Sequence, residues 1–174
     1  MPFTPYHFGP MFLLGILLLS FVDLSTIMIA GVILDIEVIV VLVFNLSQPL
    51  HGFFHTYFGA TLVAITLSIV LWPLRKFLND IVILLGIHQE SNYRMILFGS
   101  LIGTESHVFL DSFLYLEMNP FYPLLGNPFL DLIPSVMIYD LCIITGILGL
   151  VLYVIRILYR KPISFPNVWS EKRD

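Results

Sequence analysis

The chain has 174 residues, a length typical of one compact domain. Hydrophobic residues make up 58% and charged residues only 11%, whereas soluble domains carry about a quarter charged side chains, so a water-soluble surface cannot be built from this composition. The formal net charge is −4, and no Lys or Arg run is interleaved with aromatic residues, which argues against nucleic acid as a partner. We therefore expect an all-α, polytopic integral membrane protein surrounded by membrane lipids.

Five apolar segments are candidates for membrane-spanning helices. The first, residues 8–21, is short and must tilt or remain partly at the interface. The other four reach the roughly 20 residues that a hydrocarbon core requires, and they are residues 24–44, 50–74, 93–116 and 135–159. We expect a bundle of about five transmembrane helices that forms one domain, residues 1–162, followed by a polar C-terminal tail, residues 163–174.

Two connections between these segments have distinct predicted structures. In residues 75–92, four apolar side chains follow helical spacing beside charged ones, which favours a short amphipathic helix on the membrane surface. Residues 117–134 contain four prolines, and proline removes a backbone donor. This second connection is therefore expected to be a structured loop, rich in aromatic residues, at the interface.

The positions of Lys and Arg indicate the orientation, because positively charged loops remain in the cytoplasm. These residues cluster after the last span and around the connection between the third and fourth spans. The N-terminus, the turn at residues 45–49 and the loop at residues 117–134 carry no Lys or Arg. We expect these three segments to face outward from the plasma membrane.

Ionisable residues in the spans gather in the predicted outer half of the bilayer. Such residues are costly to bury, and they indicate function where they converge. Four elements contribute: His7 before the first span, Asp35 and Glu37 in the second, His51 and His55 at the start of the third, and His107 and Asp111 in the fourth. Their similar depth predicts one common site that faces outward.

The spacing of these residues predicts a metal site. His51 and His55 are four apart, as are His107 and Asp111. On a helix, residues four apart rise about 6 Å and point to nearly the same side. Imidazole nitrogen and carboxylate oxygen in this arrangement suit zinc or a similar divalent ion.

Small residues continue the same helical rows inward. Gly59 follows His55, while Gly99 and Gly103 precede His107. Since small residues let helix backbones approach closely in a membrane, we expect the third and fourth spans to pack tightly below the site.

Each candidate also has a structural interpretation. A single histidine at a helix end, such as His7 or His51, is more often interfacial or hydrogen-bonded than a ligand. Asp35 and Glu37 are two apart, so both cannot face one site from a regular helix, and Glu37 is expected to support the site. Glu105 is expected to hydrogen-bond a neighbouring helix, and for Asp23 the structural interpretation leads.

Several short motifs occur in the order found in one known family. They are the opening MPFTPYH, the Asp35-Ile36-Glu37 segment, GFFHT at residues 52–56, SHVFLD at residues 106–111 and PFYP at residues 120–123. On these residues the chain resembles the YdjM-like predicted membrane-bound metal-dependent hydrolases. His51 stands where that family often has an arginine, and Glu37 replaces its second aspartate. The family is also distantly similar to zinc-dependent phospholipases C, and this implies phosphoester hydrolysis.

Two functional hypotheses follow. The first is a metal-dependent hydrolase in which one or more divalent ions, of which zinc fits best, activate water to attack an ester or phosphoester of a small molecule or lipid. Its candidate metal ligands are His7, Asp35, His55, His107 and Asp111, with His51 and Glu37 as further ligands or general bases. The rival is a non-enzymatic membrane protein, either a metal-ion or proton transporter or a scaffold with a structural metal. The sequence leaves the oligomeric state open.

Overall fold

The computed structural model describes residues 4–159, and this part of the chain is helical without strands, as predicted. The predicted tail at residues 163–174 lies outside the described residues. In chain order the elements are η1 (Thr4–His7), α1 (Phe8–Leu17), α2 (Leu24–Ile33), α3 (Asp35–Val43), η2 (Phe53–His55), α4 (Tyr57–Leu84), α5 (Tyr93–Ser112) and α6 (Ser135–Leu158).

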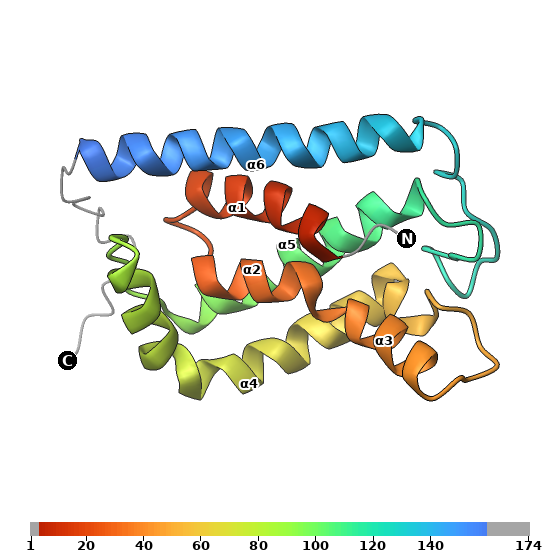
Figure 1. Ribbon diagram of the computed structural model, residues 1–174. Helices are drawn as coiled ribbons and strands as arrows, with labels where there is room; N and C mark the ends of the chain where they lie inside the picture. The colour runs from red at the N-terminus through yellow and green to blue at the C-terminus, as the bar shows by residue number, and fades with distance from the viewer. Residues whose placement is uncertain (1–3, 160–174) are drawn as a thin grey trace.

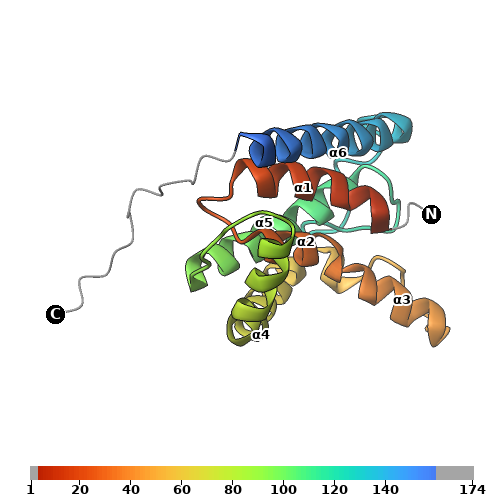
Figure 2. The same ribbon diagram turned by 60° about the vertical axis from the view of Figure 1, so that its left-hand side comes forward.

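The helices pack as layers, with α2 and α5 in the middle (Figure 1). Helix α1 lies on α2 and is covered by α6, while α4 packs against α5 on the opposite side. The start of α1, α3 and the loop that follows α5 all lie at the same end of the bundle (Figure 1). Seen from the second direction, α3 projects away from the other helices (Figure 2).

Within residues 4–159, three segments are long and apolar enough to cross a membrane. They are Leu24–Val43, Tyr57–Leu84 and Ser135–Leu158. The first contains both α2 and α3, so the second predicted span is divided at Leu34 into two helices. Helix α6 exposes many large apolar side chains, among them Ile147 and Leu150, which fits contact with acyl chains.

The predicted surface helix at residues 75–92 is wrong as a separate element. Helix α4 continues through Pro73 to Leu84, and the chain after it is not helical. The helix changes direction in its yellow-green part (Figure 1), as expected where proline removes a backbone donor and crowds the preceding turn. Arg75 donates to the Trp72 carbonyl at 3.0 Å and lies over its indole ring. Gly86, with φ +80°, follows the helix end in a left-handed conformation that suits glycine.

The small residues of α5 pack against α2, which corrects the expectation that they face the third predicted span. A Cβ atom on Gly103 would lie 2.5 Å from the Ala30 Cβ and 2.9 Å from the Ile27 carbonyl oxygen. Gly99 lies similarly close to the backbone at Asp23. Both helices present small residues at their contact, so their backbones approach more closely than larger side chains would allow.

Polar residues at the N-terminal end of α2 are structural, as expected for Asp23. Its carboxylate caps the helix by accepting a hydrogen bond from the Thr26 amide at 2.7 Å and bonds from nearby hydroxyl groups, including that of Ser91. The Gln89 side chain donates to two carbonyls of the α1–α2 turn and accepts from the Leu24 amide. These groups hold the C-terminal end of α1 and the N-terminal ends of α2 and α5 together.

The α2–α5 contact generates a first prediction. Gly103→Val should destabilise the protein by about 1–3 kcal/mol, because the added isopropyl group overpacks a closed contact. The measurement is the melting temperature in detergent, with Phe98→Val on the exposed face of the same helix as control. Equal melting temperatures for the two variants would show that the close approach does not matter for stability.

Candidate metal centre

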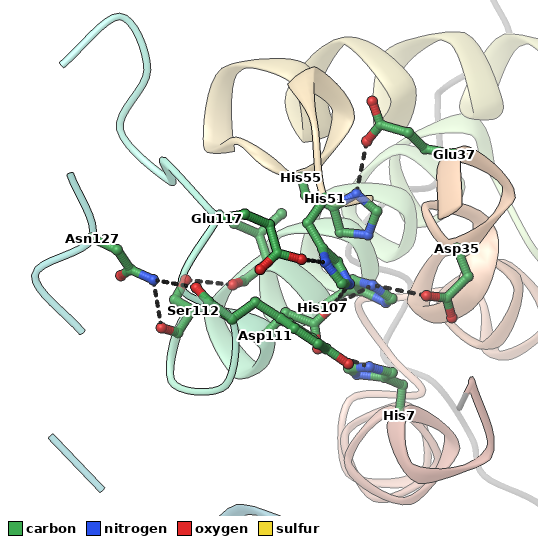
Figure 3. A network of polar contacts seen from close by, with 12 residues as sticks. His7, Asp35, Glu37, His51, His55, His107, Asp111, Ser112, Glu117 and Asn127 are labelled. Carbon is green, nitrogen blue, oxygen red and sulfur yellow. Dashed lines mark hydrogen bonds and ion pairs between the residues drawn. The ribbon is translucent and has the colours of Figure 1, made fainter. Parts of the chain in front are cut away.

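The predicted convergence of the ionisable residues is confirmed at one end of the bundle. One ligand atom from each of Asp35, His55, His107 and Asp111 lies within 4.8 Å of the others, and these four residues could hold a metal ion. They come from the α2–α3 junction, η2 and α5, so the site joins three separate parts of the chain (Figure 3). His7 and His51 lie beside this cluster, each against Asp111.

His107 is held in a defined orientation by α2. Its Nδ1 lies 2.8 Å from the Gly31 carbonyl oxygen. A carbonyl only accepts, so Nδ1 carries the proton and Nε2 of the neutral ring carries a lone pair. That Nε2 lies 3.2 Å from Asp111 Oδ2 and 3.7 Å from Asp35 Oδ1, both acceptors. A cation between these atoms would turn both of these contacts into favourable ones.

His55 repeats the same arrangement from η2. Its Nδ1 lies 2.8 Å from Glu37 Oε2, while the other oxygen of Glu37 accepts the Phe54 amide at 3.3 Å. The His55 Nε2 is buried and has no hydrogen-bond partner. Burial lowers the pKa of His55 more than the Glu37 hydrogen bond raises it. The ring is therefore held neutral, which is the form that binds metals.

His51 also has an acceptor on Nδ1, here the carboxylate of Glu117 at 2.8 Å. Its ring stacks on Tyr115 with centroids 3.7 Å apart, and its Nε2 lies 4.0 Å from Asp111 Oδ2. Burial raises the pKa of Glu117. The hydrogen bond with His51 and a backbone hydrogen bond lower that pKa, and the net shift is downward. Glu117 is therefore an ionised acceptor that orients His51.

The histidine pair does not lie on the third predicted helix, which corrects the spacing argument for His51 and His55. His51 lies in the loop before η2, His55 ends η2, and α4 begins only at Tyr57. The Thr56 side chain accepts from the Gly59 amide at 2.9 Å and caps α4 there. The two rings meet edge to face, with centroids 4.8 Å apart, so the loop brings them together without helical spacing.

His7 approaches Asp111 from the opposite side of the cluster. Its Nε2 lies 3.2 Å from Asp111 Oδ1, and its ring stacks on His107 with centroids 4.0 Å apart. His7 is 4% exposed, and its Nδ1 has no hydrogen-bond partner. The carboxylate of Asp111 is thus in contact with histidines on both oxygens.

The unsatisfied atoms of the site fit a cation. Within residues 4–159, six buried side-chain nitrogen or oxygen atoms lack a hydrogen-bond partner. Five of them belong to this site: His7 Nδ1, Asp35 Oδ2, His55 Nε2, His107 Nε2 and Asp111 Oδ1. An unsatisfied buried group costs about 1–3 kcal/mol. Two ligand atoms on one zinc ion lie at most about 4.3 Å apart, so small side-chain rotations would close the observed cluster around an ion.

Sequence reasoning identified every residue of the four-member cluster but missed Glu117. Glu117 is predicted from the sequence only as the start of the loop at residues 117–134. It is, however, the first charged residue after Asp111 and follows the C-terminal end of the same helix, α5. Asp35 and Glu37 do face different sides, as expected: Asp35 meets His107, whereas Glu37 lies behind His55 on its Nδ1. Glu105 accepts from the Thr61 hydroxyl at 2.7 Å and so bonds a neighbouring helix, as expected.

Comparisons of the chain with protein-family models, with curated proteins and with solved structures found no match. Function is therefore inferred from the chemistry of the site, which is a safer guide than fold in any case. Histidine and carboxylate ligands, with the ring Nδ1 atoms hydrogen-bonded to other acceptors, are typical of protein sites for zinc and related divalent ions.

The orientation of His55 generates a second prediction. Glu37→Gln keeps the size of the side chain but removes the charge that fixes the Nδ1 proton of His55, so zinc affinity should fall about 10–100-fold. Competition titration with a chromogenic chelator measures the affinity. Glu105→Gln is the matched control, since its carboxylate bonds Thr61 outside the site. Equal affinities for both variants would rule out a supporting role for Glu37.

Proposed function

We propose that this protein is a membrane-embedded, metal-dependent hydrolase of esters or phosphoesters, with zinc as the preferred ion. The observation that carries the proposal is the common arrangement of His51, His55 and His107, each with Nδ1 on an acceptor and Nε2 toward the carboxylate cluster. A bound divalent cation supplies a Lewis acid that makes water a nucleophile near neutral pH. Hydrolysis then adds one water across the bond and releases an acid and an alcohol.

Each residue has a distinct role in this proposal. The ligands are the four residues of the cluster, Asp35, His55, His107 and Asp111. Glu37 positions His55 instead of acting on the substrate, because it lies on the far side of the ring. The ring of His51 can accept a proton from water at Nε2, and Glu117 would stabilise the resulting imidazolium as in other histidine–carboxylate pairs. His7 is placed to serve as a further ligand beside Asp111.

The exposure of the ligands supports a catalytic site over a closed structural one. The side chains of His55, His107 and Asp111 are at most 2% exposed, whereas that of Asp35 is 15% exposed. A structural zinc site is enclosed by four protein ligands, while a catalytic site keeps a position open. In this proposal the open position lies on the side of Asp35, the most exposed of the four ligands.

Transport of an ion across the bundle is disfavoured by the packing below the site. The α2–α5 contact is closed by Gly103 against Ala30 and Gly31. Asp23, at the other end, is committed to capping α2. A metal reaching His107 therefore meets close-packed backbone on the inner side, which fits binding from one face.

The proposed placement in the membrane has five crossing segments, with α1 and α5 added to the three apolar spans. The site then lies in the outer half of the plasma membrane, and Arg75 and Lys76 lie at the cytoplasmic face. Charge asymmetry supports this orientation. The clustering of the start of α1, η2 and the loop after α5 at one end of the bundle agrees with a single outward face.

The third prediction separates catalysis from a structural metal. Asp111→Asn keeps the shape of the side chain but removes the charge that contacts His7, His51 and His107. Zinc affinity should fall by more than the roughly 10–100-fold seen on losing a supporting group, and activity should fall with it. Zinc content, melting temperature and hydrolysis of bis(4-nitrophenyl) phosphate are measured on the same preparations, with Asp140→Asn on the exposed face of α6 as control.

Three outcomes of this experiment are decisive. Loss of zinc and activity with a nearly unchanged melting temperature supports the hydrolase. Loss of zinc with a sharp fall in melting temperature, from a wild type without activity, supports a structural ion, because metal-binding energy is then folding energy. Full zinc retention by Asp111→Asn would remove it from the ligand set.

A fourth prediction concerns the orientation. In a Cys142→Ala background, Leu125→Cys in the loop after α5 should react with a membrane-impermeant maleimide in intact cells, because that residue is 83% exposed and is placed outside. Lys76→Cys on the exposed face of α4 should react only after the cells are permeabilised. The reverse labelling pattern would show that the site faces the cytoplasm.

A further inference from the structure

Two apolar grooves flank the α2–α3 junction, on either side of the site. The α3–α4 groove has a volume of about 290 Å³, and its apolar wall includes Val40, Phe54 and Val63. The α1–α2 groove has a volume of about 280 Å³, and its wall includes Phe8 and Met28. The α3–α4 groove has two polar lining residues, Glu37 and Gln48, whereas all lining residues of the α1–α2 groove are apolar.

The two grooves share a ridge that carries a metal-ligand candidate. Ile33 and Ile36 line both grooves, and Asp35 lies between them in the sequence. The Asp35 side chain is 15% exposed, more than the other three clustered side chains, and its Oδ1 lies 3.7 Å from His107 Nε2. The most exposed side chain of the cluster therefore belongs to the segment that separates the two grooves.

Each groove has lining residues that lie toward the middle of the bundle from the site. In the α1–α2 groove, Met28 lies seven residues before Asp35, about two helical turns inward. In the α3–α4 groove, Val63 lies about two turns inward from the start of α4 at Tyr57. An occupant with a polar end at Asp35 would therefore extend two apolar arms inward.

We propose that a diacyl glycerolipid sits astride the α2–α3 junction, with one acyl chain in each groove and its phosphodiester beside Asp35. The inference deepens the proposed function by naming the substrate class, and it rests on that function for the chemistry at the head. Binding of the two acyl chains requires only the grooves.

The chemistry of the grooves selects this occupant. Both lie along Leu24–Val43, a segment apolar enough to cross a membrane, so acyl chains are the molecules that reach them. Within the bilayer no water covers the groove walls, so van der Waals packing of chain methylenes against them supplies the attraction. An anionic phosphodiester complements a divalent cation held by Asp35, His55, His107 and Asp111. A lipid with one chain would leave one groove without its occupant.

The test measures lipid retention separately from activity. Full-length protein in detergent is incubated with dioleoylphosphatidylglycerol or with its single-chain lyso form, and bound lipid per chain is counted by native mass spectrometry. Val63→Trp fills the α3–α4 groove and Val32→Trp fills the α1–α2 groove. Ile147→Trp, on the 58% exposed surface of α6, is the matched control for an added indole.

The wild type and Ile147→Trp should retain one diacyl lipid per chain and hold the lyso form at least tenfold more weakly. Each groove variant should lower diacyl retention at least tenfold. Equal retention of the two lipids, or retention unaffected by either groove variant, would overturn the proposal. If a variant does not fold, Val40→Trp or Met28→Trp fills the same groove from another wall residue.

Measuring the same retention in Asp111→Asn and in chelator-treated protein distinguishes this proposal from the hydrolase proposal. Lipid retained at one per chain without zinc or hydrolysis supports the lipid site even if the hydrolase proposal fails. Zinc-dependent hydrolysis of bis(4-nitrophenyl) phosphate by a protein that retains no diacyl lipid would support the hydrolase and refute the lipid site.

Discussion

The close packing of α2 against α5 is the constraint on which the site depends. Gly103 lets the two backbones approach at Ala30 and Gly31, and that approach brings the Gly31 carbonyl within 2.8 Å of His107 Nδ1. This hydrogen bond fixes the ring so that its other nitrogen faces Asp111 and Asp35. A larger side chain in place of Gly103 would separate the helices, and the ring would lose its orientation together with its acceptor.

The remaining histidines follow the same physical logic with different acceptors. Glu37 holds His55 and Glu117 holds His51 through the ring Nδ1 atoms, so each ring turns its Nε2 toward a group of carboxylate oxygens. Buried carboxylates are stable only beside positive charge. A metal ion held by Asp35, His55, His107 and Asp111 would supply that charge, and these four residues could hold one.

The proposed chemistry and the proposed ligand meet at the α2–α3 junction. The break at Leu34 ends one helix and starts another at Asp35, and it places a carboxylate between two apolar grooves. Acyl chains need apolar walls, whereas a phosphodiester needs positive charge, and under the two proposals this junction offers the walls while a metal ion beside Asp35 would supply the charge. A membrane-embedded site can thus reach a lipid head without drawing the lipid out of the bilayer.

The sequence by itself determined the helical class, the approximate position of the helices and the depth at which His55, His107 and Asp111 lie, because hydropathy and helical periodicity are local properties of the chain. It did not reveal which helix the Gly99 and Gly103 row faces, that α4 passes through Pro73, or that His51 and His55 lie before α4. Only the tertiary structure decided the acceptors of the histidines. His107 and Gly31 are 76 residues apart and His51 and Glu117 are 66 apart, and such pairs depend on how the helices pack.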